Sequence, residues 1–118
     1  MKEKLKRGDV LLVNIDPTVG SEQKGTRPVV VIQNDVGNEY SPSIIIAAIT
    51  SKVKKIFDIH VQVFPPEGGL AKESIVLLNQ IRTIDKSRVI KKKGTFSTEI
   101  VRKINNTLKI SLDLENEI

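Results

Sequence analysis

The sequence contains no cysteine and a single histidine, His60. The absence of cysteine excludes disulfide bonds, thiol nucleophiles and thiolate metal sites, and one histidine cannot build a histidine-rich metal site. We therefore expect no metal and no other cofactor. Any chemistry in this chain is expected to be metal-free or based on carboxylates.

Aromatic residues are also scarce, at 3% of the chain with no tryptophan, which argues against a wide stacking platform for single-stranded nucleic acid. No segment approaches the roughly 20 apolar residues of a membrane span. The strongly charged stretch 2–7 is followed by no apolar signal-peptide core. We therefore expect a cytoplasmic protein that makes no membrane contact.

A length of 118 residues is sufficient for one hydrophobic core and too short for two, so we predict a single domain over residues 1–118. The formal net charge is +5. A basic surface attracts phosphate groups, which gives modest support for a polyanionic partner, although many soluble proteins are equally basic for other reasons.

Short Val- and Ile-rich segments separated by turn residues predict β-strands. The segments are 9–15, 28–33, 43–50, 58–64 and 74–80, with 81–85 continuing the last one as a short strand or 3₁₀ turn. Residues 34–38 and 91–94 have the composition of turns. The almost wholly apolar segment 43–50 is predicted to lie at the centre of the sheet.

One amphipathic helix is predicted after the strands. Ser97 can cap its N-terminus, and Glu99 lies in the first turn, where the helix dipole favours an acid. Apolar residues recur at every fourth position, at Ile100, Ile104, Leu108 and Leu112. The whole pattern predicts a mainly β fold with α, in which five or more short, mostly antiparallel strands form a curled sheet closed by the C-terminal helix.

Arg27 lies between a polar loop bracketed by two glycines and the apolar run 29–32. Pro28 has a locked φ and also restricts the residue before it, so Arg27 is predicted to be held at the mouth of a strand. A guanidinium fixed in this way is suited to holding an anion. A surface arginine that ends an ordinary loop fits this stretch equally well.

Two further polar residues occupy distinctive positions. Thr50 ends the central apolar strand beside Ser51 and a group of lysines, where a β-favouring residue and a solvated loop are the simplest interpretation. His60 alternates with Ile59 and Val61 in a predicted strand. Because side chains alternate between the two faces of a strand, His60 is predicted to face away from the core.

Four motifs follow one another along the chain: Arg7-Gly8-Asp9-Val10, Gly20-Ser21-Glu22-Gln23-x-Gly25-x-Arg27-Pro28-Val29, Ala47-Ala48-Ile49-Thr50 and Gln80-Ile81-Arg82-Thr83-Ile84-Asp85. Together they resemble the MazF (PemK-like) toxins of bacterial toxin–antitoxin systems, most closely the MazF, or EndoA, branch of Gram-positive bacteria. The resemblance implies an SH3-like barrel of about five to seven short, mostly antiparallel strands plus a C-terminal helix.

The resemblance also implies a function. Members of this family are sequence-specific, metal-independent endoribonucleases that cut single-stranded mRNA and act as homodimers. A MazE-like antitoxin is the expected inhibitor, and any DNA contact is expected only through the antitoxin complex.

Individual roles follow from the same resemblance. The family's catalytic arginine and threonine fall on Arg27 and Thr50, and Glu22 is a candidate catalytic helper. The loop that closes over substrate in similar toxins matches Ser21, Glu22 and Gln23. The positions that line the RNA groove in family members match Ser51, His60 and Gln80.

The chain departs from one branch of the family. The plasmid Kid branch has a histidine in the loop and an Arg-x-Asp pair on the fifth strand, where this chain has Ser21, Leu77 and Asn79. A mechanism that depends on those three residues does not carry over, so the general base and the general acid are left open.

Metal-free cleavage is possible when the 2′-hydroxyl of RNA attacks the adjacent phosphorus, which leaves a 2′,3′-cyclic phosphate and a 5′-hydroxyl. Arg27 is suited to gripping two oxygens of the anionic transition state, and Thr50 can add a hydroxyl hydrogen bond. Arginine stays protonated at neutral pH, so Arg27 is poorly suited to moving protons, and general acid/base action by Arg27 stays open only as what the resemblance implies.

Two other classes of function stay open. The first is a toxin of the same fold that inhibits a protein target such as DNA gyrase, against which the motif contexts of Arg27 and Thr50 argue. The second is a nucleic-acid-binding barrel without catalysis, which the net charge favours but no stacking motif supports.

Overall fold

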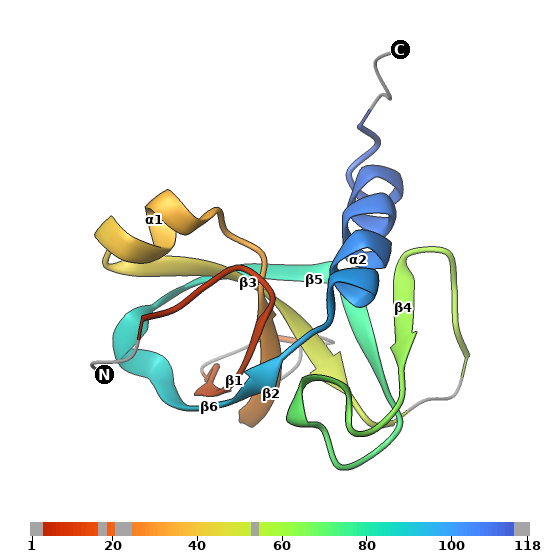
Figure 1. Cartoon of the computed structure of the whole chain (residues 1–118), viewed down its shortest axis with the longest axis horizontal. Coiled ribbons are helices and arrows are strands. Elements are labelled where there is room, and N and C mark those ends of the chain that lie inside the picture. Colours follow the sequence, from red (N-terminus) through yellow and green to blue (C-terminus); the bar gives the residue numbers. More distant parts are fainter. Residues whose placement is uncertain (1–3, 17–18, 21–24, 53–54, 115–118) are drawn as a thin grey trace.

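The computed structural model describes residues 4–16, 19–20, 25–52 and 55–114, and these form one antiparallel sheet with flanking helices (Figure 1). The strands are β1 (Asp9–Asn14), β2 (Thr26–Val31), β3 (Ser43–Thr50), β4 (His60–Val63), β5 (Ser74–Asp85) and β6 (Val89–Thr95). The helices are α1 (Asp35–Tyr40) and α2 (Thr98–Ser111), and the 3₁₀ turns are η1 (Glu67–Gly69) and η2 (Lys86–Arg88).

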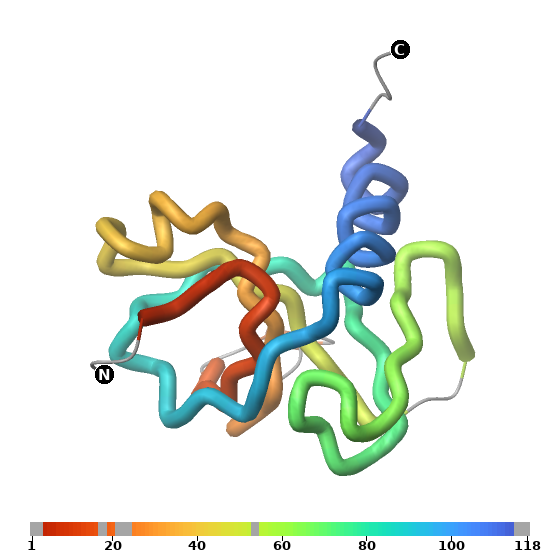
Figure 2. Tube along the Cα trace, viewed as in Figure 1, coloured from red at the N-terminus to blue at the C-terminus, as the bar shows by residue number. Residues whose placement is uncertain are grey.

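The strand order is β4-β5-β3-β2-β1-β6, with every neighbouring pair antiparallel. β5 crosses the molecule and bends near its middle (Figure 2), where its pairing partners on β3 jump from Ala47↔Ile81 to Ala48↔Leu77. This bulge lets one strand pair with both halves of β3 while the sheet curls. The expected mainly β fold with a C-terminal helix is confirmed.

The central strands of the sheet are buried on both faces. In β3, Ala47 and Ile49 face a core that includes Ile100 and Ile104 of α2, and Ile46 faces a second core shared with β1 and β2. Helix α2 begins as predicted, with the Ser97 hydroxyl accepting from the backbone N–H of residue 100 at 3.3 Å. The helix packs beside β4 (Figure 1). No helix in the described part of the chain has the length and apolar content needed to cross a bilayer.

The backbone of the turn η1 packs directly against the backbone of β6. A Cβ atom at Gly69, whose φ is +74°, would lie 2.2 Å from the carbonyl oxygen of Lys93. A Cβ atom at Gly94 would lie 2.7 Å from the carbonyl group of Gly68. These approaches require glycine, and they fix the backbone of β6 against the segment that leads into β5.

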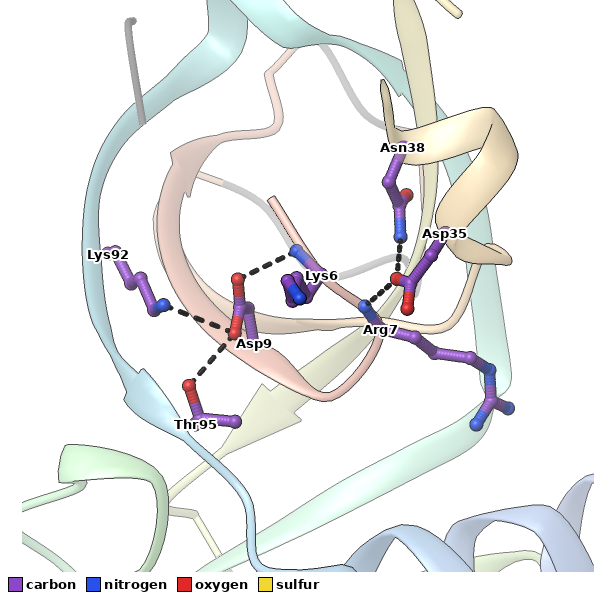
Figure 3. Close-up of polar contacts among 7 residues, drawn as sticks. All are labelled: Lys6, Arg7, Asp9, Asp35, Asn38, Lys92 and Thr95. Atoms are coloured by element: carbon purple, nitrogen blue, oxygen red, sulfur yellow. Dashed lines mark hydrogen bonds and ion pairs between the residues drawn. The ribbon is translucent and has the colours of Figure 1, made fainter. Parts of the chain in front are cut away.

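Asp9 ties the start of the chain to β6 (Figure 3). Its carboxylate is 1% exposed and accepts hydrogen bonds from the backbone N–H of Lys6 at 2.8 Å and the hydroxyl of Thr95 at 2.9 Å. The ammonium of Lys92 lies 3.4 Å away. Three donors therefore compensate the burial of one charge.

A second carboxylate holds the same segment against α1 (Figure 3). Asp35 accepts from the backbone N–H of Arg7 at 2.7 Å and from the side chain of Asn38 at 3.1 Å. These hydrogen bonds to the charged form lower the pKa of Asp35. The motif Arg7-Gly8-Asp9 is therefore part of the framework of the fold.

Two predicted turns are regular elements. Residues 34–38 begin α1, because the Asn34 side chain accepts from the backbone N–H of Gly37 at 2.9 Å and caps a helix instead of closing a turn. Residues 91–94 lie in β6, where they pair with β1. Lysines are tolerated there because β6 is an edge strand with exposed side chains.

Several boundaries also differ from the predicted ones: β1 ends at Asn14, β2 ends at Val31, and β4 spans His60–Val63 instead of 58–64. β2 begins at Thr26, so Arg27 lies within the strand and not before it. β5 is one strand through Asp85, because its bulge preserves pairing across the bend. Leu112 follows the last residue of α2 and is 52% exposed, so the apolar stripe of the helix ends at the partly buried Leu108.

Asp9→Asn is expected to lower the free energy of unfolding by about 2 kcal/mol, because it removes the charge partner of Lys92 and turns an amide N–H₂ toward existing donors. Urea denaturation of wild type and variant measures this difference. Glu99→Gln, which breaks an exposed ion pair with Lys103 of 3.7 Å, is the control and is expected to change stability little. Equal effects of the two variants would contradict the role given to Asp9.

Candidate functional site

The pairing of β2 with β3 indicates how the two predicted catalytic residues, Arg27 and Thr50, lie relative to each other. The register pairs Val29 with Ala48 and Val31 with Ile46. Extended by two residues, the same register sets Arg27 across from Thr50. Directly opposed residues on antiparallel strands project to the same face, and neighbouring strands lie about 4.8 Å apart.

The same face continues across the sheet to β4. Thr50 pairs with Ile75 on β5, and Ile75 pairs with Gln62 on β4. One row further along, Leu77 pairs with both Ala48 and His60. His60 therefore lies on the face of Arg27 and Thr50, two strands and roughly 10 Å across the sheet from β3.

Three apolar side chains lie between these polar groups. Ala48, Ile75 and Leu77 form a small buried cluster of their own on this face. Beside Ala48 opens a pocket of about 380 Å³, lined by Ile15, Ile46, Asn79, Gln80, Ile81 and Arg82. Gln80 reaches this pocket because it lies in the stretch of β5 that the bulge leaves without a pairing partner on β3.

Arg27 and Ser51 share a different pocket, of about 210 Å³, near the start of β2 and the end of β3. Ser51 is exposed there, whereas Thr50 is only 6% exposed. The Thr50 hydroxyl oxygen accepts from the backbone N–H of Lys52 at 3.2 Å. Because one lone pair is engaged in this way, the hydroxyl proton can be donated to another group.

His60 is half-buried at the edge of the sheet. Its Nδ1 accepts from the backbone N–H of Phe57 at 3.2 Å, and the two rings meet edge to face at 5.6 Å between centroids. Burial lowers the pKa of His60 below its usual 6.5, against the opposing charge of Asp58. The ring is therefore mainly neutral at pH 7, as acceptance by Nδ1 requires.

His60 also lines a third pocket, of about 380 Å³, between β4 and α2. The residues that share it are Val61, Gln62, Phe64, Lys103, Asn106 and Thr107. The groove residues predicted from the sequence thus lie in three separate hollows of the monomer, with Ser51 next to Arg27, Gln80 next to Ala48, and His60 against α2.

The predicted loop residues Ser21, Glu22 and Gln23 lie outside the described residues. The roles assigned to all eight site residues stay predictions. Sequence reasoning did not identify Asn79 and Arg82 as neighbours of Gln80, or Lys72 and Lys93 as neighbours of Arg27. Within the described ranges, no three His, Cys, Asp or Glu side chains gather in a way that could hold a metal ion.

Because the chain has one histidine, its titration can be followed by NMR without overlap. We expect a pKa below 6.5 in the folded protein, and a lower one in Asp58→Asn, which removes the opposing charge. The unfolded state then binds a proton more readily, so the free energy of unfolding falls as the pH drops below about 6.5. His60→Gln is expected to remove this dependence, and a pKa at or above 6.5 would contradict the burial argument.

The comparison with known proteins agrees with the motifs. The model of a family described as PemK-like, MazF-like toxin of type II toxin-antitoxin system matches residues 6–112. Endoribonuclease MazF of Staphylococcus saprophyticus is 47% identical over 111 residues, which cover 93% of this chain and 92% of that protein.

Solved structures share the fold. An endoribonuclease from a mycobacterial species, solved in complex with its cognate antitoxin, superimposes with a TM-score of 0.81 at 19% identity, over 96% of this chain and 99% of that one. MazF from Deinococcus radiodurans superimposes with a TM-score of 0.82 at 21% identity, over 95% of this chain and 99% of that one. With a matching family model over residues 6–112 and a relative at 47% identity, the chain belongs to the family of PemK-like, MazF-like toxins of type II toxin–antitoxin systems.

Proposed function

We propose that this chain, an endoribonuclease toxin by its family and its 47%-identical relative, cleaves single-stranded mRNA at specific sequences and without a metal ion. The reaction is attack of the RNA 2′-hydroxyl on the adjacent phosphorus, which releases the 5′-oxygen of the next nucleotide. The observation that supports the proposal is the β2–β3 register, which is paired as far as Val29↔Ala48 and, when extended by two residues, sets Arg27 across from Thr50.

Arg27 and Thr50 divide the stabilisation of the transition state. A guanidinium can donate two parallel hydrogen bonds to the non-bridging oxygens of the phosphorane, whose negative charge rises as the 2′-oxygen attacks. The Thr50 hydroxyl oxygen already accepts from the backbone N–H of Lys52, so its proton is available for a phosphate oxygen. Both groups lie on paired strands, which limits the reorganisation needed during reaction.

Two protons must also move. One leaves the 2′-hydroxyl as the cyclic phosphate forms, and one reaches the departing 5′-oxygen. Arg27 stays protonated at neutral pH and is not suited to accept the first. Glu22, which precedes β2 in the sequence, is the proposed helper in this transfer, because a carboxylate can accept a proton from the 2′-hydroxyl.

Selection of RNA follows from the chemistry, because DNA lacks the attacking 2′-hydroxyl. Selection of bases is proposed to use hydrogen bonds from Ser51, His60 and Gln80, with Ser21 and Gln23 of the loop. The pocket of about 380 Å³ that Gln80 lines beside Ala48 supports this proposal, since an unstacked base needs space next to hydrogen-bonding groups.

The assembly is also part of the proposal. We expect a homodimer that is inhibited by a MazE-like antitoxin in the cytoplasm and that meets DNA only through the antitoxin complex. Antitoxin complexes are known for neighbours of the same fold, among them the mycobacterial endoribonuclease and MazF of Deinococcus radiodurans.

Incubation of a long single-stranded RNA with the protein in excess EDTA tests the chemistry. Discrete cuts with 2′,3′-cyclic phosphate and 5′-hydroxyl ends are expected for the wild type. Arg27→Ala and Thr50→Val are each expected to lower kcat about 100-fold, the typical loss for one donor to a developing anion. Arg27→Lys keeps the positive charge but loses the paired N–H donors of the guanidinium, and its kcat is expected to fall similarly.

The outcomes separate the alternatives. Normal cleavage by Arg27→Lys would contradict the proposal that the guanidinium donates two parallel hydrogen bonds to the phosphate oxygens. RNA that is bound but left intact by the folded wild type would favour a binding barrel, and RNA neither bound nor cut would favour a toxin with a protein target such as DNA gyrase. Lys109→Ala, on the exposed side of α2, serves as a charge-changing control and is expected to cut like the wild type.

A further inference from the structure

The 210 Å³ pocket beside Arg27 collects positive charge from separate parts of the chain. Arg27 comes from β2, Lys72 from the segment before β5, and Lys93 from β6. The remaining lining residues are apolar or carry hydroxyls, and none of the described lining residues is acidic. Three cations around one hollow create a positive potential that attracts anions.

The two lysines are not committed to carboxylates within the described residues. The ion pairs found there involve Lys4, Lys92 and Lys103. Glu73, next to Lys72 in sequence, accepts a hydrogen bond from the Gln62 side chain on β4. Their charges are therefore not neutralised by partners in this part of the chain.

The pocket is built on fixed backbone. The carbonyl of Lys93 lies against Gly69 so closely that no Cβ fits between them. The hydroxyl of Ser74, which is 3% exposed, donates to the carbonyl of Lys72 at 2.9 Å. Both lysine side chains are exposed, so ammonium groups on anchored backbone reach the solvent side of the pocket.

The size and chemistry of the pocket fit a phosphate group. Its volume of about 210 Å³ is below the range of roughly 300–1,000 Å³ typical of pockets for drug-sized ligands. Lysine binds phosphate as a point charge and carries no base information. Arg27 lines this pocket together with Ser51, the residue that follows Thr50, so the pocket adjoins the proposed catalytic pair.

We infer that Lys72 and Lys93 hold a phosphate of the RNA that adjoins the scissile one, so that the backbone passes from the Arg27–Thr50 row into this pocket. The inference rests on the proposed function and adds two positioning residues to it. By fixing a neighbouring phosphate, the lysines align the 2′-hydroxyl with the phosphorus that Arg27 grips.

Lys72→Ala and Lys93→Ala test the inference on an oligoribonucleotide that carries one mapped cleavage site. Lys91→Ala is the matched control, because it removes the same charge from an exposed position on β6 outside the pocket. Each pocket variant is expected to lower kcat/KM about fivefold, the upper range for one exposed charge contact. Each is also expected to make the slope of log kcat/KM against log salt shallower by about 0.7, the value for one lost contact on a single strand.

The position of the phosphate is tested by replacing single phosphates on either side of the cleavage site with uncharged methylphosphonates. At the phosphate that the lysines hold, the replacement is expected to impair the wild type but to add no further loss to the double variant. Additive losses at both sides, or pocket variants that match Lys91→Ala in rate and salt slope, would overturn the inference. Unchanged thermal unfolding shows that all variants are folded.

A binding measurement separates this inference from the proposed function. Fluorescence anisotropy with the same oligonucleotide, made uncleavable by a 2′-O-methyl group at the cut site, reports phosphate contacts without chemistry. If the wild type binds but does not cut, weaker binding by Lys72→Ala and Lys93→Ala than by Lys91→Ala supports the inference while the proposed function fails. Equal binding by all three variants overturns the inference, whether or not the RNA is cut.

Discussion

The candidate site depends on the register between β2 and β3. Because side chains alternate along a strand, a slip of one residue would turn Arg27 to the face opposite Thr50. The consecutive valines 29–31 do not specify this register, since both faces of β2 are buried. Polar contacts just after β2 specify it instead. The side-chain amide of Gln33 donates to the carbonyl oxygen of Ser43 at 3.0 Å, and the backbone N–H of Ile32 donates to the carbonyl oxygen of Ile45 at 3.0 Å.

The motifs that carry the family resemblance divide between framework and site. The carboxylate of Asp9 belongs to a buried network of polar contacts that joins the start of the chain to β6 (Figure 3). The pairing of β6 with β1 places Lys93 at the pocket that Arg27 also lines. A motif that contains none of the predicted catalytic residues therefore still determines where Lys93 lies relative to Arg27.

Local patterns predicted what is determined locally. Segment 43–50 was predicted at its observed bounds, because a β-branched run between turn residues leaves one interpretation, and Ser97 marked the start of α2. β6 was missed because lysines at 91–93 carry no strand signal, and only pairing with β1 makes them a strand. Alternation predicted that His60 faces away from the core, but its shared face with Thr50 depends on pairing through β5, which no local pattern contains.

The cationic pocket and the residues proposed to contact RNA bases lie in different parts of the molecule. The cations of the 210 Å³ pocket lie near the start of β2 and the end of β3, whereas Gln80 on β5 lines the pocket beside Ala48 and His60 lies on β4. Phosphate contacts position a nucleic acid, and hydrogen bonds to base edges specify it. Arg27 stands at the junction of the two regions. Under the proposed mechanism, bases bound out of place would leave the scissile phosphate out of line with the Arg27 guanidinium, which would couple the sequence that is read to the reaction at phosphorus.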